Sequence, residues 1–525
     1  MRTFPRRFPI WMSSSILLVC MLAACGGGGG GTGDTPPVVT PPVPPATGPA
    51  WTGFGNDAQH SAQAGIATQA LTRIRWRTPV DIAPQNSGEL LTHYGSPVIS
   101  TRNTVLVPVK TGASGGFRVE ARAGDNGSLL WSAGSDYVLP PVAAWTPSYN
   151  IVLTASNRLY APGAGGKLMY RDDVDSATGA VQNVVFYGSA AYAASPSTYD
   201  ASIFINTPLT ADAAGNVYFG FIASGTHPAG LASGIARVSA SGVGTWVGAA
   251  AASGDAAIGK VAMNSAPALS PDMKTLYVAV GAVNNGQPSG YLLALDSTTL
   301  ATQGKVALTD PVTGDPSWIS DSGTSSPTVG PDGDVYFGVL EANAPAHNFR
   351  GWLLHFNAAL SVKKTPGSFG WDDTPSVVPA TMVPSYSGPS AYLLMSKYNN
   401  YGGNGSGDGK NRIAILDPGQ SQADFISGNA VMKEVLTILG PTADAGYPGG
   451  VTEWCINTAA VDPFTKSVIA NSEDGYLYRW NLATNQLSER IQLTGGIGES
   501  YTPTAIGADG AVYAINNAVM FSVGR

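Results

Sequence analysis

The chain repeats one pattern of apolar and polar positions eight times between Gly95 and Gly524. Each copy opens on a small residue, in most copies followed by Pro. A short apolar run, a turn and a second run rich in β-branched and aromatic residues then follow. Short runs of this composition, bounded by turns, predict β-strands. The openings are Ser96-Pro97-Val98, Pro141-Val142-Ala143, Thr207-Pro208-Leu209, Ala266-Pro267-Ala268, Ser326-Pro327-Thr328, Thr374-Pro375-Ser376, Thr458-Ala459-Ala460 and Thr502-Pro503-Thr504.

The turns inside the copies are typical of β-hairpins. Pro331-Asp332-Gly333 precedes Val335–Gly338, and Ala508-Asp509-Gly510 precedes Ala511–Tyr513. Gly, Asn and Asp accept the positive φ that tight turns require. A small sheet of this kind cannot bury both faces alone, so the copies are expected to stack radially. The pattern predicts an all-β chain with a single β-propeller of eight four-stranded antiparallel blades. The second and sixth copies are the least regular, which leaves seven blades as the alternative.

The last copy ends one strand short, at Arg525. A matching strand pattern, Leu71–Val80, lies ahead of the first copy. Pairing this N-terminal strand with the last copy would close the ring and remove the exposed edges that an open stack leaves. The sequence therefore predicts ring closure by an N-terminal strand.

The first copy carries a more specific motif, Ala121–Trp131, with the sequence Ala-Arg-Ala-Gly-Asp-Asn-Gly-Ser-Leu-Leu-Trp. It resembles the blade motif of quinoprotein (PQQ-like) propellers, in which a strand turns through Gly and returns to a Trp that packs between blades. By this resemblance Trp131, and Trp480 in a weaker copy, are blade-packing residues. Trp51–His60 resembles the lead-in of the same family. The resemblance covers residues 51–525 and implies the propeller fold.

The N-terminus is typical of a secretory signal, with basic Met1–Arg7 followed by mostly apolar Ile10–Met21. Leu22-Ala23-Ala24-Cys25 resembles the lipobox of bacterial lipoproteins, which implies a signal peptide over 1–24 and lipidation of Cys25. Because Gly26 is not Asp, the resemblance implies the outer membrane, with the protein facing the periplasm or exposed on the surface. An ordinary signal peptide and twin-arginine export are the alternatives.

The Gly-rich and Pro-rich segment 25–50 is expected to be a tether that combines a flexible coil with a stiff spacer. The formal net charge is -7. Removal of the signal arginines would make the mature chain more acidic still. A chain without a basic stripe is not expected to bind nucleic acid. We expect a monomer.

Candidate chemistry is sparse. Quinoprotein dehydrogenases stack the quinone between a Trp and an adjacent Cys-Cys disulfide, beside a calcium or lanthanide ion held by Glu, Asn and Asp. The cysteines here are Cys20, Cys25 and Cys455, with no adjacent pair. The resemblance leaves one possible pocket, formed by Glu453, Trp454, Cys455 and Asn457. In the alternative interpretation, Trp454 packs between blades and Cys455 is a small buried apolar residue.

Other residue patterns give weaker indications of a functional site. The five histidines are scattered without metal-ligand spacing, so no metal is predicted. Asp372-Asp373 could act as paired carboxylates, but their Gly and Pro neighbours favour turn capping. The insert Asn399–Asn411 is expected to be a mobile loop.

Two function classes follow. The first is a membrane-anchored, non-catalytic lipoprotein that serves as a binding or scaffold module for envelope proteins or polymers, without a cofactor; this resembles BamB-type outer-membrane assembly propellers. The alternative is a PQQ-dependent oxidoreductase with an atypical pocket, using PQQ and calcium. The missing Cys pair favours the first class.

Overall fold

The computed structural model describes residues 46–84, 95–113, 115–141, 149–282, 290–319, 325–496 and 500–525. All of the described residues lie in one compact unit, which extends to Arg525. The predicted signal peptide, the lipidated Cys25 and most of the tether lie outside the described residues. No helix in the described ranges is long and apolar enough to cross a membrane.

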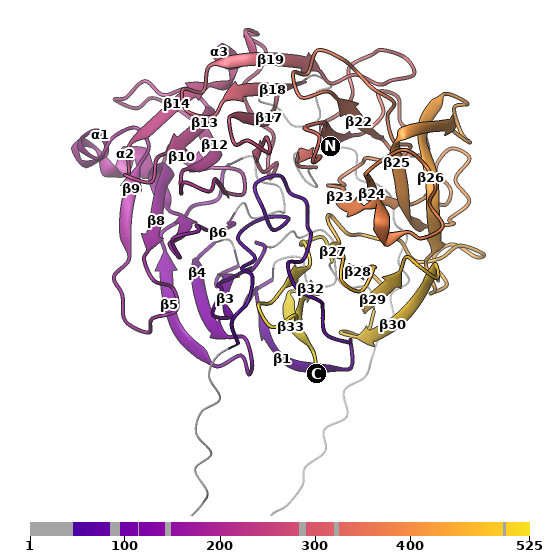
Figure 1. Ribbon diagram of the computed structural model, residues 1–525. Coiled ribbons are helices and arrows are strands. Elements are labelled where there is room, and N and C mark those ends of the chain that lie inside the picture. The colour runs from indigo at the N-terminus through magenta and orange to yellow at the C-terminus, as the bar shows by residue number, and fades with distance from the viewer. Residues whose placement is uncertain are drawn as a thin grey trace, which may run out of the picture. The chain divides into compact units, whose positions relative to one another are not determined.

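Residues 46–525 form eight antiparallel sheets arranged around a central axis (Figure 1). The first four blades are β2(Val98–Ile99), β3(Thr104–Lys110), β4(Phe117–Ala123), β5(Leu129–Ser135); β6(Val152–Leu153), β7(Leu159–Pro162), β8(Lys167–Arg171), β9(Gln182–Val185); β10(Ile203–Ile205), β11(Thr210–Ala211), β12(Val217–Ala223), β13(Gly234–Val238), β14(Gly244–Gly248); and β15(Lys260–Val261), β16(Ala268–Leu269), β17(Thr275–Gly281), β18(Gly290–Asp296), β19(Thr302–Ala307). In blades 3 and 4 the inner position is shared by two short strands that pair with the same neighbour.

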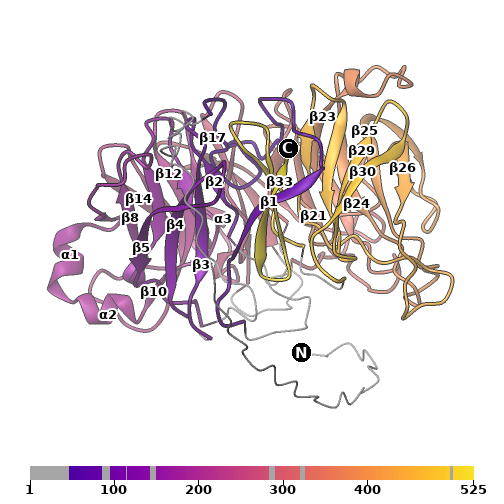
Figure 2. The ribbon, with the colours of Figure 1, turned by 90° about the horizontal axis from the view of Figure 1, so that it is seen from below.

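The last four blades are β20(Thr328–Val329), β21(Val335–Val339), β22(Trp352–Phe356); β23(Ser376–Pro379), β24(Tyr392–Tyr398), β25(Arg412–Ala423), β26(Ala430–Leu439); β27(Ala460–Asp462), β28(Ser467–Asn471), β29(Tyr476–Asn481), β30(Gln486–Gln492); and β31(Ala505–Ile506), β32(Val512–Asn516), β33(Val519–Gly524), β1(Arg73–Pro79). Short helices, among them α1(Ser189–Ala194), α2(Pro196–Asp200) and α3(Ala249–Ser253), lie in the connections, with 3-10 turns at Ala164–Gly166 and Ala380–Met382. Figure 2 shows the blades from the side.

Eight blades confirm the predicted number, and the seven-bladed alternative is wrong. The irregular sixth copy has the longest strands of the ring, β25 and β26. Blade 5 departs from the four-stranded expectation, because isolated bridges to Lys363 and Gly367 replace a regular outer strand beside β22. The second predicted opening lies partly outside the described residues, and the inner strand of blade 2 is β6, further along the chain.

The Ser and Thr residues of the openings link neighbouring blades around the axis. The backbone N–H of Ala266 donates to Ser326 Oγ (2.9 Å), and that of Ser326 donates to Thr374 Oγ1 (2.9 Å). Thr458 Oγ1 in turn donates to the Thr374 carbonyl (2.8 Å). The repeated hydroxyls thus connect blades 4 to 7 at the points where their inner strands begin.

The segment Gly48–Gln69, here called the hub segment, crosses the centre of the ring (Figure 1, indigo). It hydrogen-bonds to the second residue of the inner strand in six blades. These residues are Ile99, Leu153, Leu269, Val329, Val377 and Val461. The inner strands are short and their edges face the axis, where an unpaired backbone group would be costly. The hub segment satisfies these edges and ties the blades together.

The ring is closed by β1, which pairs antiparallel with β33 from Arg73 opposite Gly524 to Pro79 opposite Val519. This is the closure that the sequence predicts. Trp76 of β1 also reaches the first blade, where its Nε1 donates to the Gly124 carbonyl (3.0 Å). A Cβ at Gly127 would lie 2.5 Å from the Trp76 ring, and Gly127 has φ +72°, so only glycine fits there.

We predict that Trp76→Ala lowers the free energy of unfolding by about 3–5 kcal/mol, because a buried aromatic side chain at the closure is removed. The control Arg77→Ala, at the exposed neighbouring position of β1, should change it by about 0.5 kcal/mol or less. Denaturant unfolding of the purified variants measures both. Equal stability of the two variants would contradict a structural role for Trp76 in ring closure.

Candidate functional site

Alternating strand direction places two sets of loops on opposite faces of the ring. Loops that precede an inner strand, or join the second strand of a blade to the third, lie on one face, here called the mouth face. A group of buried and half-buried polar side chains lies on this face at blades 6 and 7. This mouth cluster comprises Asp372, Asp373, Lys397, Tyr401, Glu453, Cys455 and Glu473.

Lys397 is at the centre of the mouth cluster and is 1% exposed. Its Nζ forms an ion pair with Asp372 Oδ1. Asp373 lies beside them and accepts hydrogen bonds from Ser396 Oγ (2.8 Å) and from the Lys397 backbone N–H (3.3 Å). The expectation that Asp372-Asp373 cap a turn is therefore wrong. Both side chains are buried, and Asp372 pairs with Lys397 of β24, the second strand of blade 6.

Burial and charge shift the pKa values in this cluster. Burial alone would lower the pKa of Lys397, but the Asp372 carboxylate, its ion-pair partner, raises it above its usual value. Burial raises the pKa of Asp373 to about 7, although Lys397 opposes this shift. Burial, followed by the nearby Asp372 and Glu453, raises the pKa of the Tyr401 hydroxyl. Perturbed groups of this kind gather at functional sites and also in structural ion-pair networks.

Glu453, Cys455 and Glu473 form the second part of the cluster. One ligand atom from each lies within 4.8 Å of the others, and Cys455 Sγ is 3.8 Å from Glu453 Oε2. Burial, Glu473 and Glu453 raise the pKa of the Cys455 thiol well above its usual value. The thiol is thus held protonated between two carboxyl side chains.

The structure divides the sequence-predicted pocket. Glu453 and Cys455 lie together, but Trp454 is 1% exposed within the apolar core of blades 6 and 7, with its ring 5.6 Å from that of Tyr478. Asn457 is buried and its Nδ2 donates to the Asp372 carbonyl (3.2 Å). Two of the four residues therefore face the polar cluster with their functional groups, while Asn457 holds the backbone beside it.

Sequence reasoning missed Lys397 and Glu473. Lys397 is the penultimate residue of β24, Tyr392–Tyr398, and a lone charged residue in this fully buried strand is a signal for a buried ion pair. Glu473 lies in the turn between β28 and β29 of the same blade as Cys455. Loops that precede an inner strand lie on the same face as loops that follow the second strand of a blade. The repeat could therefore have predicted that Lys397 and Glu473 lie on the same face as Asp372 and Cys455.

Both tryptophans expected to pack between blades are buried. Trp131 of blade 1 donates through Nε1 to the Val174 carbonyl of blade 2 (2.8 Å), and the Arg171 guanidinium lies 4.3 Å from its ring. Trp480 of blade 7 lies in one apolar cluster with residues of blade 6, including Ile415.

A quinone cofactor does not fit these residues. A flat cofactor needs an open slot between two walls, whereas the indole of Trp454 is enclosed by core side chains and Cys455 has no neighbouring cysteine. A calcium ion takes oxygen ligands. The trio of Glu453, Cys455 and Glu473 includes sulfur, a donor that suits softer ions such as zinc. The chemistry of the trio therefore differs from that of a calcium site.

A second buried group has the residue types of a hydrolytic triad but not its geometry. Ser368 Oγ (3.4 Å) and Asp424 Oδ2 (3.3 Å) both contact Nε2 of His347, while Nδ1 lies 3.0 Å from the Gly351 carbonyl. A triad needs the acid and the nucleophile on different ring nitrogens. The imidazole is also stacked on Trp352 with ring centroids 3.7 Å apart, so this group is structural.

The insert Asn399–Asn411 is packed rather than free-standing. Asn348 Nδ2 donates to Asn400 Oδ1 (2.9 Å), and Asn400 Nδ2 donates to Asp408 Oδ1 (2.7 Å). Side-chain amides that bridge blades 5 and 6 thus fix a segment that composition alone suggested would be mobile.

We predict that Asp373→Asn flattens part of the pH dependence of stability. The pKa of Asp373 is raised from 3.8 to about 7, so the folded state holds this proton more tightly than the unfolded state. Its contribution is complete below pH 4 and is lost as the pH rises through 7. Wild type should therefore lose on the order of 4 kcal/mol more than the variant over this pH range, because each pH unit between the two pKa values contributes about 1.4 kcal/mol.

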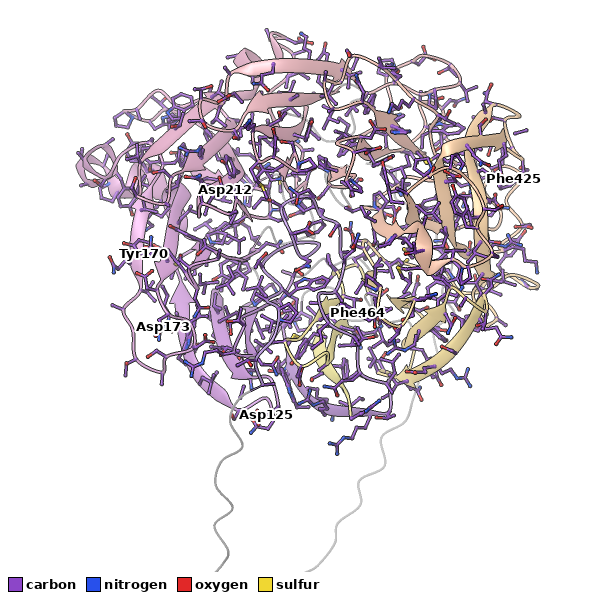
Figure 3. The ribbon with its side chains drawn as sticks, in the orientation of Figure 1. Asp125, Tyr170, Asp173, Asp212, Phe425 and Phe464 are labelled. Carbon is purple, nitrogen blue, oxygen red and sulfur yellow. The ribbon has the colours of Figure 1, made fainter. Side chains whose placement is uncertain are left out.

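Urea unfolding at several pH values measures this difference. Asp125→Asn, at an exposed turn at the edge of the ring (Figure 3), is the matched control and should follow wild type. Parallel curves for wild type and Asp373→Asn would contradict the shift.

No family model and no curated protein matches the chain. Among solved structures, a europium-containing methanol dehydrogenase is similar with a TM-score of 0.54 and 11% identity, over 90% of this chain and 90% of that chain. A quinohemoprotein alcohol dehydrogenase from Comamonas testosteroni has a TM-score of 0.51 and 12% identity, over 91% of this chain and 81% of that chain. BamB from Moraxella catarrhalis has a TM-score of 0.40 and 12% identity, over 88% and 98%. At such identities the likeness is one of fold. The chain has an eight-bladed β-propeller fold, similar to the fold of the two dehydrogenases.

Proposed function

We propose that the protein is a lipid-anchored, non-catalytic binding module of the bacterial cell envelope, held to the outer membrane through Cys25. Its partners are envelope proteins or polymers, and it acts as a monomer. The propeller supplies a rigid body, and the Gly-rich and Pro-rich tether separates this body from the lipid.

One observation supports the non-catalytic part of the proposal: the ionisable side chains of the mouth cluster contact and pair with one another. Lys397 is enclosed and paired with Asp372, and Cys455 is held as a thiol between Glu453 and Glu473. A general base or nucleophile must reach its substrate within hydrogen-bond distance. An enclosed lysine that is already paired with a carboxylate cannot reach a substrate, so we assign Lys397 a structural role.

The hub segment supports the rigid part of the proposal. Because six inner strands bond to one segment, the blades cannot move apart without breaking those bonds. A rigid ring presents its loops and rims in fixed positions, which reduces the entropy lost when a partner binds.

We predict that Cys25→Ser moves the protein from the membrane fraction to the soluble fraction, because the variant lacks the thiol that the lipid would modify. The melting temperature should not change, since the substitution lies outside the propeller. Cys455→Ser is the matched control: the same chemical change at the buried cysteine should leave membrane association intact. Membrane association of Cys25→Ser equal to that of wild type would refute the anchor.

We predict that purified protein mixed with PQQ and calcium oxidises no alcohol or sugar in a dye-linked assay, because the enclosed Trp454 offers no face for the quinone. Calorimetry should detect no tight quinone binding. The alternative function, a PQQ-dependent oxidoreductase, would replace the binding module if the quinone bound tightly and turnover were lost in Glu453→Gln.

A further inference from the structure

A groove of about 780 Å³ lies between blades 2 and 3, away from the mouth cluster. One wall comes from β7, β8 and β9, and the other from the β13–β14 turn and β14. Figure 3 shows Tyr170, one of the lining residues, near the outer edge of the ring. The volume lies within the range of about 300–1,000 Å³ that is usual for small-ligand sites.

Aromatic rings and amides line the blade 2 wall. Tyr160 and Tyr170 are opposite each other across β7 and β8, with ring centroids 5.8 Å apart. Tyr170 is half-buried, and its hydroxyl donates to Gln182 Oε1 (2.7 Å). Asn183 and Tyr187 follow along the same wall, and Trp246 stands on the blade 3 side, also half-buried.

The groove carries no uncompensated charge. Within the described part of the chain, Arg158 is the one lining residue with a charged side chain. Its guanidinium lies 4.6 Å from the Tyr170 ring and pairs with Asp172 (Nε to Oδ1, 2.5 Å). A phosphate or carboxylate ligand would have to compete with Asp172, so the lining favours a neutral ligand.

The C-terminal end of the edge strand β9 lies against blade 3. A Cβ on Gly244 of blade 3 would lie 1.8 Å from the Phe186 carbonyl oxygen, and one on Gly242 would lie 3.6 Å from Val184 Cγ2. The blade 3 turn thus already covers the end of the edge strand. Strand addition, the common way to bind an extended peptide at a sheet, needs that edge free.

We propose that this groove binds a neutral glycan segment. A pyranose ring has an apolar C–H face that stacks on an aromatic ring, and hydroxyls around its edge that hydrogen-bond to amides and hydroxyls. Tyr170 and Trp246 supply half-buried aromatic rings, and the Asn183 side chain supplies an amide that can both donate and accept. The inference rests on the proposed function, because it names one class of envelope polymer as the partner, but it concerns a different part of the molecule from the lipid anchor.

The experiment uses the full chain in a detergent without a sugar headgroup. Saturation-transfer NMR and calorimetry test three neutral tetrasaccharides: chitotetraose, cellotetraose and maltotetraose. At least one should bind to wild type. Tyr170→Ala and Val243→Arg should each weaken that binding by about tenfold or more, the first by removing a stacking surface and the second by filling the groove.

Val243 lines the groove and is 63% exposed, so its replacement should not disturb folding. Val362→Arg is the matched control, at a position of blade 5 that is 50% exposed and away from the groove, and it should bind like wild type. Lack of binding to all three sugars at millimolar concentration would overturn the proposal, as would equal binding by Val243→Arg and Val362→Arg. Retained membrane association in the same preparation would show that only the glycan inference, and not the anchor, had failed.

Discussion

Backbone hydrogen bonding at the axis is the constraint on which this structure depends. The inner strands have two to four residues, and each leaves one edge facing the centre of the ring. Backbone groups there must be paired, because water reaches them poorly and unpaired groups are costly. The hub segment supplies partners in six blades, and β1 completes the eighth blade as its outer strand by pairing with β33. Blade packing and the buried polar groups are positioned by this arrangement.

The fold was largely predictable because each copy of the repeat contains the residues that define its own strands and turns. Ser326 and Thr374 mark where inner strands begin, and their hydroxyls join adjacent blades, so composition and position agree. The missing strand at the C-terminus pointed directly to Leu71–Val80. The irregular sixth copy was harder to interpret, because its long strands β25 and β26 contain bulges that interrupt strict alternation.

The candidate site was less predictable, since it is assembled across blades rather than within one motif. Glu453 and Cys455 are close in sequence and in space, but Lys397 comes from a strand of blade 6, Asp372 from the loop before that blade and Glu473 from a turn of blade 7. Trp454 was predicted both as a possible pocket wall and as a packing residue, and only its contacts with Tyr478 decide between them. The groove between blades 2 and 3 matches no sequence motif, because Tyr170 and Trp246 come from different blades.

The route of the hub segment has a consequence for how the chain folds. Ala62 and Ala64 bond to Val461, and Arg73 pairs with Gly524, so residues near the start of the propeller find their partners only after almost all of it has been made. Contacts between such distant residues slow folding, since a long loop must close before they form. The strand β1 must therefore remain unpaired until β33 has been made, so completion of the eighth blade is a late step of folding.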